Sequence, residues 1–272
     1  MPNASASASL PPWFPGVWTR EWIDRRGTRN DLFDVRFLQT PTLFADMRIP
    51  RDRPSFSHAK SFADLSDTDL LALAKQRGFT GSTTVAGDLA TWHHEIDFQP
   101  PEGTPDIGRL ERIDGARMYE HATDSSYTES WRSLSDGGRS FLVIRVEHLS
   151  RLDRTLLVAG DHFLYVRNRR TDLPAAESFD SLIASAHGER ATIIEYLDCE
   201  FSAGRVRSGT VPWEIERSTL PWREGKHLGF VDSVMIDDAG SIVDRASSHD
   251  QWSVPVNTLT LAARIALFPP LR

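Results

Sequence analysis

Residues 92–98 hold the densest group of titratable side chains in the 272-residue chain. If this segment is a β-strand, its side chains alternate between two faces. One face then carries His93, Glu95 and Asp97, and the other carries Trp92, His94, Ile96 and Phe98. A histidine beside two carboxylates could act as a general acid or base, because histidine titrates nearest neutral pH. The alternative is an ordinary half-buried strand, with His94 among inward apolar neighbours and the acidic face in water.

The same segment does not predict a metal site. Neighbouring side chains on one face of a strand lie about 6.6 Å apart, too far to complete a coordination shell without a second strand. The chain has no His-Glu-x-x-His motif, and Cys199 is its single cysteine. Glycine-rich phosphate loops, dinucleotide fingerprints and nucleophile elbows are also absent from the sequence. We therefore expect neither a metal ion nor a cofactor.

A second group of residues suits a ligand pocket. On alternating strands Trp18 shares a face with Arg20, and Asp46 shares one with Arg48. Aromatic rings mixed with a guanidinium and a carboxylate can stack an apolar body and hydrogen-bond one polar end. The predicted lining consists of Trp18, Arg20, Gln39, Asp46, Arg48, Trp92 and His94. The alternative is an Asp46–Arg48 ion pair on a solvated face, with Trp18 in an apolar core.

The elements that must position these residues are predicted to be mainly strands. Short alternating runs rich in β-branched and aromatic residues recur about every ten residues, bounded by turn formers. One helix is predicted to begin at Ser66 and end at Gly78, and another to cover residues 178–186, whereas residues 193–201 are predicted to form a strand. We predict a mostly β fold of two tandem antiparallel β-barrels, calycin- or lipocalin-like, each with one short helix. Closure into barrels removes exposed strand edges; an immunoglobulin-like sandwich is the alternative.

Similar features recur along the chain and indicate an internal duplication. Phe44 and Arg48 recur as Phe163 and Arg167, 119 residues later, and the pair Ser61-Phe62 recurs 117 residues later. The predicted organisation is a disordered tail over residues 1–12, a first barrel over 13–124 and a second over 125–272. The adjacent histidines at 93 and 94 have no counterpart in the second half. We therefore expect any site to lie in the first half.

Composition excludes several function classes. A net charge of −7 argues against a nucleic-acid binder and against attachment to an anionic membrane surface. The first dozen residues lack the basic and apolar regions of a signal peptide. The longest apolar run, residues 259–268, contains Arg264 and is too short to span a bilayer. A cytoplasmic protein is the expectation.

Several segments resemble one known family. These are Gly16-Val17-Trp18-Thr19-Arg20, Phe37-Leu38-Gln39-Thr40-Pro41, residues 44–54 and residues 218–225. They resemble the fungal Hri protein family and its bacterial relatives over nearly the whole chain. The resemblance implies two lipocalin-like barrels, a homodimer and no firmly established activity. The fungal members resemble interaction partners of a protein kinase and of the secretory machinery.

Three functions remain open. The first is binding of a small, largely apolar ligand in the first barrel. The second is a cofactor-free isomerase, cyclase or dehydratase, with His94 or the Glu95–Asp97 pair as the base and Arg20 or Arg48 stabilising negative charge. The third is a protein-interaction module with Trp222 and Arg223 as interface anchors. Binding or interaction is favoured over catalysis, because no motif in the sequence is specific to a reaction.

Overall fold

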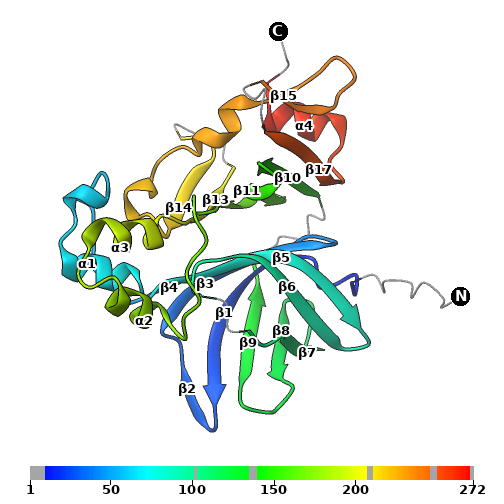
Figure 1. Ribbon diagram of the computed structural model, residues 1–272. Helices are drawn as coiled ribbons and strands as arrows, with labels where there is room; N and C mark the ends of the chain where they lie inside the picture. Colours follow the sequence, from blue (N-terminus) through cyan, green and yellow to red (C-terminus); the bar gives the residue numbers. More distant parts are fainter. Residues whose placement is uncertain (1–9, 101–102, 135–139, 207–210, 246–249, 270–272) are drawn as a thin grey trace, which may run out of the picture.

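The computed structural model describes residues 10–100, 103–134, 140–206, 211–245 and 250–269. The chain folds into a closed β-barrel followed by a second, open β-sheet that packs against the outside of the barrel (Figure 1). The predicted mostly β fold is confirmed, and so is a barrel in the first half. Among the described helices, none is long and apolar enough to cross a membrane.

Eight antiparallel strands close the barrel. They are β1 (Gly16–Arg25), β3 (Phe33–Gln39), β4 (Leu43–Pro50), β5 (Arg77–Ala86), β6 (Leu89–Asp97), β7 (Asp106–Arg112), β8 (Arg117–Ala122) and β9 (Thr128–Ser133). Each pairs with the next in chain order, and β9 returns to pair with β1. The short β2 (Thr28–Asn30) extends β1 as a hairpin. Closure leaves no free edge among these eight strands, which is the usual reason for a small barrel.

The predicted boundary between the halves is wrong at residue 124. Strand β9 lies beyond that point, yet it completes the first barrel by pairing with β1 and β8. Residues 1–9 of the predicted tail lie outside the described residues, but Leu10, near the end of that tail, belongs to the fold. Leu10 is buried and Phe14 is fully buried, and both pack into the apolar cluster inside the barrel. Burial of these two side chains plugs one end of the barrel.

The second half forms a six-stranded sheet in the order β14-β13-β12-β11-β10-β17. Its strands are β10 (Phe141–His148), β11 (Arg151–Ala159), β12 (His162–Arg167), β13 (Glu200–Arg205), β14 (Glu214–Ser218) and β17 (Gln251–Asn257). Within the described residues the two end strands, β14 and β17, do not pair, so the predicted second barrel is not confirmed. A C-terminal layer covers one face instead. It consists of the 3-10 helix η3 (Gly229–Ser233), the hairpin β15 (Val234–Ile236) and β16 (Ile242–Asp244), and helix α4 (Leu261–Leu267).

The barrel and the sheet share one apolar core. Leu43, Ala45 and Met47 point outward from β4, where they pack with Leu164 and Val166 of β12. The alternation of β4 therefore decides the architecture: its odd-numbered residues join the two halves, and its even-numbered residues face the barrel interior. The shared core holds the outer wall of the barrel rigid, so the site inside it is built on fixed strands.

Helices gather at one end of both sheets (Figure 1). The 3-10 helix η1 (Phe62–Asp64) and helix α1 (Asp67–Leu73) connect β4 to β5, and helices α2 (Phe179–Ser185) and α3 (Arg190–Leu197) connect β12 to β13. Ser66 caps α1 through a reciprocal capping box with Asp69, as its sequence predicts. The predicted strand over residues 193–201 is wrong, because Ile193 and Leu197, four residues apart, bury one face of a helix. The described part of the second half thus has three α-helices, where one was predicted.

Candidate functional site

The barrel interior contains a cavity of about 880 Å³, large enough for a small organic molecule. It opens where the β6–β7 and β8–β9 connections meet, because residues from both connections line it. Inside, Phe37, Trp92, Met118 and Trp131 form apolar walls. Charged side chains lie among these walls, so the interior combines apolar surface with buried polar groups.

Two buried ion pairs supply most of that charge. Arg48 donates to both carboxylate oxygens of Asp46 at 2.8 and 3.2 Å, with its guanidinium 5.0 Å from the Phe79 ring. Burial raises the pKa of Asp46 above its ordinary value, although the Arg48 charge acts in the opposite direction. Across the barrel, Arg20 of β1 forms an ion pair with Glu129 of β9, and both side chains are 4% exposed. Each pair places opposite charges together and so lowers the cost of burying them.

Glu120 is the third interior carboxyl group. It lies directly opposite Glu129 on the neighbouring strand, and it accepts a hydrogen bond of 3.1 Å from the Tyr127 hydroxyl. Burial, followed by the charge of Glu129, raises the pKa of Glu120 well above its ordinary value. The same burial, with the charge of Glu120, raises the pKa of Tyr127. Glu120 therefore favours its neutral form, which can donate as well as accept a hydrogen bond.

Four buried polar atoms around this interior have no hydrogen-bond partner in the described structure. They are the indole nitrogens of Trp92 and Trp131, Nε of Arg20 and Oε2 of Glu129. Their side chains belong to residues that are 2–6% exposed. A buried polar group without a partner costs about 1–3 kcal/mol, so native interiors rarely keep several together. Three of these residues, Trp92, Glu129 and Trp131, also line the cavity, so a small movement of their side chains would bring the unpartnered atoms to a bound molecule.

His94 lies at the cavity wall near the mouth. Its Nδ1 lies 2.7 Å from Asp97 and its Nε2 lies 3.1 Å from Asp106, and its ring stacks on Phe79 at 4.5 Å. Burial alone would lower the pKa of His94, but its hydrogen bonds to Asp106 and Asp97 and their charges raise it to about 9. The histidine is thus charged at neutral pH and fastens the end of β6 to the start of β7.

A β-bulge separates residues that the sequence pattern places on one face. The register of β6 against β5 shifts at Gly81, which pairs with His94, while Thr80 pairs with Ile96. The extra residue, Glu95, faces outward and binds Arg145 of β10 at 2.8 and 3.2 Å. A side chain at Gly81 would put its Cβ 1.9 Å from the His93 carbonyl oxygen, so this bulge requires glycine.

The bulge corrects the predicted acid–base group. Residue 93 borders the cavity, but the His93 side chain is exposed, with Nε2 2.9 Å from the Thr84 hydroxyl. Beyond Glu95 the faces exchange, so Asp97 joins His94 at the cavity while Ile96 and Phe98 enter the core between the halves. A face shared by His93, Glu95 and Asp97 is therefore wrong, and Glu95 cannot act in the cavity.

The structure places four of the seven predicted lining residues at the cavity. Asp46, Arg48, Trp92 and His94 line the cavity, and Arg20 holds Glu129, which lines it too. Trp18 donates from its indole nitrogen to the Phe14 carbonyl oxygen at 2.9 Å, within the apolar cluster at the plugged end. Gln39 accepts from Thr83 at 2.9 Å and donates to the Thr40 carbonyl oxygen at 2.8 Å. Trp18 and Gln39 therefore stabilise the barrel away from the cavity.

Sequence analysis misses Glu120, Tyr127, Glu129 and Trp131. Their strands are short, and their place inside depends on β9 pairing with β1, which is distant in sequence. A signal exists: Met118, Glu120 and Ala122 alternate with polar residues, as do Glu129 and Trp131, so each carboxyl group shares a face with an apolar side chain. A carboxyl group on the apolar face of a strand is the pattern that points to a buried acid.

The predicted interface anchors lie at the junction of the two halves. Trp222 and Arg223 belong to the 3-10 helix η2 (Pro221–Arg223). The Trp222 ring meets the Phe62 ring edge-on at 4.8 Å, and Arg223 donates to Glu200 at 3.2 Å. Both residues thus make contacts within the chain, and the homodimer stays a prediction.

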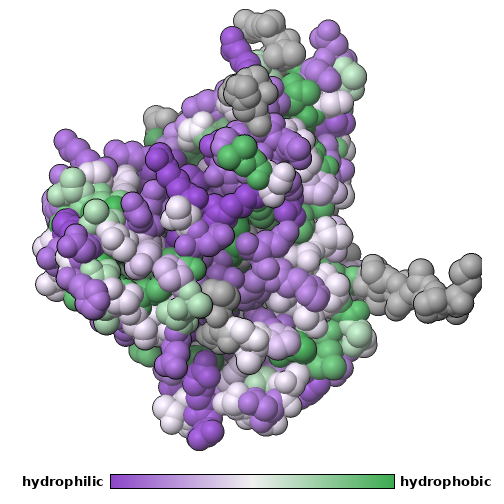
Figure 2. Space-filling view, in the orientation of Figure 1, coloured by the Kyte–Doolittle hydropathy of each residue, from purple (hydrophilic) through white to green (hydrophobic). Residues whose placement is uncertain are grey.

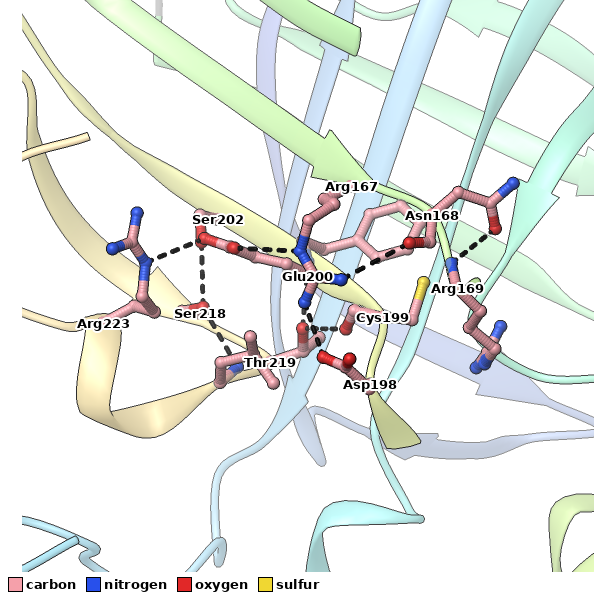
Figure 3. A network of polar contacts seen from close by, with 12 residues as sticks. Arg167, Asn168, Arg169, Asp198, Cys199, Glu200, Ser202, Ser218, Thr219 and Arg223 are labelled. Carbon is pink, nitrogen blue, oxygen red and sulfur yellow. Dashed lines mark hydrogen bonds and ion pairs between the residues drawn. The ribbon is translucent and has the colours of Figure 1, made fainter. Parts of the chain in front are cut away.

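A polar network lies on the second sheet (Figure 3). Arg167, which the predicted duplication pairs with Arg48, binds Asp198 at 2.6 Å and approaches Glu200 at 3.8 Å. The Ser202 hydroxyl donates to Glu200 at 2.7 Å and contacts the Ser218 hydroxyl at 2.9 Å. Cys199 is fully buried beside this network, and burial raises the pKa of its thiol, so it is a poor nucleophile.

The comparisons with known proteins support the fold alone. No family model matches the chain, and no curated protein matches it. A crystal structure of YLR301w, an uncharacterized protein from Saccharomyces cerevisiae, is similar with a TM-score of 0.51 at 11% sequence identity. The similarity covers 90% of this chain and 99% of the yeast chain. At this identity it supports a common arrangement of the two sheets and carries no information about activity.

Proposed function

We propose that the protein binds a small organic molecule inside its first barrel. The observation that carries this proposal is the cavity of about 880 Å³, whose wall includes Trp92, Glu129 and Trp131, three residues that each keep a buried polar atom without a partner in the described structure. Those atoms destabilise the empty protein, and a ligand with matching donors and acceptors would remove that cost once the side chains turn toward it. The apolar walls around them would hold the body of the ligand.

The barrel architecture agrees with this proposal. Eight strands in chain order enclose an interior just wide enough for side chains or for one small ligand, as in lipocalins. We extend the proposal to a lipocalin-like mode of binding, in which the ligand enters by the open end. This step is an analogy of fold, and the unpartnered polar atoms remain its physical basis.

Native mass spectrometry of the protein purified from its own host tests the proposal. A bound small molecule should appear as a mass shift that denaturation removes. Ala122 lines the cavity near its mouth, so an Ala122→Phe variant should abolish the shift by filling the entrance. Ala86→Phe, at an exposed position on β5, is the matched control and should keep the ligand. An unliganded wild-type protein that also shows no melting shift in a metabolite screen would exclude binding.

An acid–base enzyme is the second candidate, and one observation favours it. Glu120 and Glu129 lie side by side, but Arg20 binds Glu129 while Glu120 stays preferentially neutral. Neighbouring carboxyl groups in environments as different as these are typical of acid–base sites. Glu120 and Glu129 thus take the place of His94, Glu95 and Asp97 as the candidate acid–base residues. A recovered ligand that the protein converts to an isomer or a dehydrated product, and that Glu120→Gln leaves unchanged, would identify an enzyme.

The surface gives less support to an interaction module. Exposed large hydrophobic residues in the described part are distributed over separate elements: Leu32, Leu71, Leu89, Ile113, Leu149, Leu261 and Ile265. Figure 2 shows hydrophobic residues on this face as small groups among hydrophilic ones. Protein-binding surfaces more often have one contiguous apolar patch.

A further inference from the structure

The carboxyl pair at Glu120 and Glu129 lacks one positive charge. Glu129 forms an ion pair with Arg20, whereas Glu120 accepts a hydrogen bond from the uncharged Tyr127 hydroxyl. Within the described residues no lysine, arginine or histidine forms an ion pair with Glu120. The two arginines of the interior are both engaged, Arg20 with Glu129 and Arg48 with Asp46.

Other charged groups near Glu120 do not correct this imbalance. From the surrounding strands Glu129 of β9 and Asp106 of β7 add negative charge, and Arg48 of β4 opposes them while bound to Asp46. The result is a rise in the pKa of Glu120, by which the protein neutralises a charge that it does not pair. A cation in the cavity would allow Glu120 to ionise.

Aromatic groups adjoin this carboxyl pair. A Cβ at Gly108 would lie 3.1 Å from both a Glu120 carboxylate oxygen and the Trp92 ring, so Trp92 and Glu120 flank the same space. Trp131 is two residues from Glu129 on β9 and points into the same interior. Indole faces attract organic cations, and indole N–H groups donate to oxygen. Oε2 of Glu129 has no donor of its own.

We propose that the ligand is an organic amine, whose ammonium group pairs with Glu120 and Glu129 beside the rings of Trp92 and Trp131. This assignment rests on the proposed function, since it needs a ligand in the barrel. Binding of the cation ionises Glu120 and so releases a proton. The affinity for an amine therefore rises with pH above the ordinary range of a carboxyl group. The affinity for an uncharged ligand of the same shape does not follow pH in this way.

Three phenols of nearly equal size test the charge of the ligand. Tyramine ends in an ammonium group, tyrosol in a hydroxyl group and 4-hydroxyphenylacetate in a carboxylate. Isothermal titration calorimetry at pH 7 should give the tightest binding for tyramine, at least about tenfold tighter than tyrosol, with 4-hydroxyphenylacetate weakest. Repeating the tyramine titration in two buffers of different ionisation enthalpy should reveal the release of a proton.

Glu120→Gln keeps the shape of the side chain and removes its charge. This variant should bind tyramine no more tightly than tyrosol and should release no proton. Glu111→Gln is the matched control, because Glu111 lies on β7 outside the barrel against His121, and it should retain the preference for tyramine. Near-ultraviolet circular dichroism confirms that both variants are folded.

The outcomes separate the two proposals. Equal binding of tyramine and tyrosol, or a preference for tyramine that survives Glu120→Gln, overturns the amine assignment and leaves ligand binding intact. A host ligand without an amino group, recovered by native mass spectrometry, also overturns the amine assignment alone. Failure of all three phenols, together with an unliganded protein from the host, overturns both.

Discussion

The interior of the first barrel and the corresponding face of the second sheet begin from the same local structure and end differently. In each half a strand carrying Phe44 or Phe163 leads through helices to a strand with a glycine bulge, at Gly81 or Gly204. In the first half this face surrounds a cavity. In the second half Phe163 and Tyr165 pack against Trp213, Phe230 and other side chains of the C-terminal region.

The polar groups of the two faces differ accordingly. The network around Glu200 joins Arg167, Arg223, Ser202 and Ser218 by direct hydrogen bonds and ion pairs (Figure 3). The barrel interior keeps unpartnered atoms on Trp92, Glu129 and Trp131 beside open space. Among the described residues, the second face also has an unpartnered indole nitrogen, that of Trp252, but Phe230 stacks on its ring. The cavity, and not the unpartnered atoms alone, therefore distinguishes the first half as the candidate binding site.

The glycine bulges should give the largest effects, because both halves need them. Gly81→Ala would place a Cβ 1.9 Å from the His93 carbonyl oxygen, and Gly204→Ala would place one 2.0 Å from that of Glu214. Each substitution forces the backbone to move, so we expect a loss of about 3 kcal/mol or more in the free energy of unfolding. Urea denaturation measures it.

Gly115→Ala is the control for both, because no atom lies within 4 Å of the added Cβ, and it should change stability little. Where Gly81→Ala still folds, it should also lose the ligand, because the bulge positions His94 and Asp97. Stability equal to that of the control would show that the bulges are not required.

The two arginines should differ in their effect on stability. Arg20→Met leaves Glu129 buried next to Glu120 without its cation, and breaking such a buried pair costs about 3–5 kcal/mol. Arg167→Met removes an arginine whose side chain is 26% exposed, and we expect about 1 kcal/mol. Denaturation curves of the two variants under identical conditions give the comparison. Equal losses of unfolding free energy would mean that the barrel interior is no more enclosed than the face of the second sheet that carries Arg167.

His94 should stabilise the first half near neutral pH and lose this contribution at alkaline pH. Its pKa is raised from 6.5 to about 9, so this stabilisation is complete below pH 6.5 and is lost as pH rises toward 9. The difference is on the order of 2 kcal/mol. The difference in unfolding free energy between wild type and His94→Gln, measured from pH 6 to 10, should decrease over this range. A difference that stays constant over this pH range would contradict a charged His94.

Glu120 should have an effect of the same sign. Its raised pKa means that the carboxyl group stabilises the fold fully only below its ordinary value of 4.5, and this contribution falls as pH increases. The glutamine of the Glu120→Gln variant cannot ionise, so the stability of this variant relative to wild type should increase between pH 4 and 8. Thermal melts over that range measure the gain, and parallel curves for the two proteins would contradict a buried, unpaired Glu120.

Local patterns could be predicted from the sequence, and contacts distant in the chain could not. Alternation puts Asp46 and Arg48 on one face of β4, which the structure shows to be the inner one, and the Ser66–Asp69 spacing places the start of α1. One extra residue in β6 reverses the faces beyond Glu95, and nothing in residues 92–98 alone shows it, because the cause is Gly81 on the neighbouring strand. Glu129 becomes a site residue only through the return of β9 to β1.

A crystal structure of the protein purified from its own host tests the central claim most directly. We predict a cavity in the barrel that holds non-protein electron density against Trp92, Glu129 and Trp131. The corresponding face of the second sheet should be covered by Trp213 and Phe230. A barrel interior filled by its own side chains, with every polar atom of those three residues bonded within the protein, would contradict it.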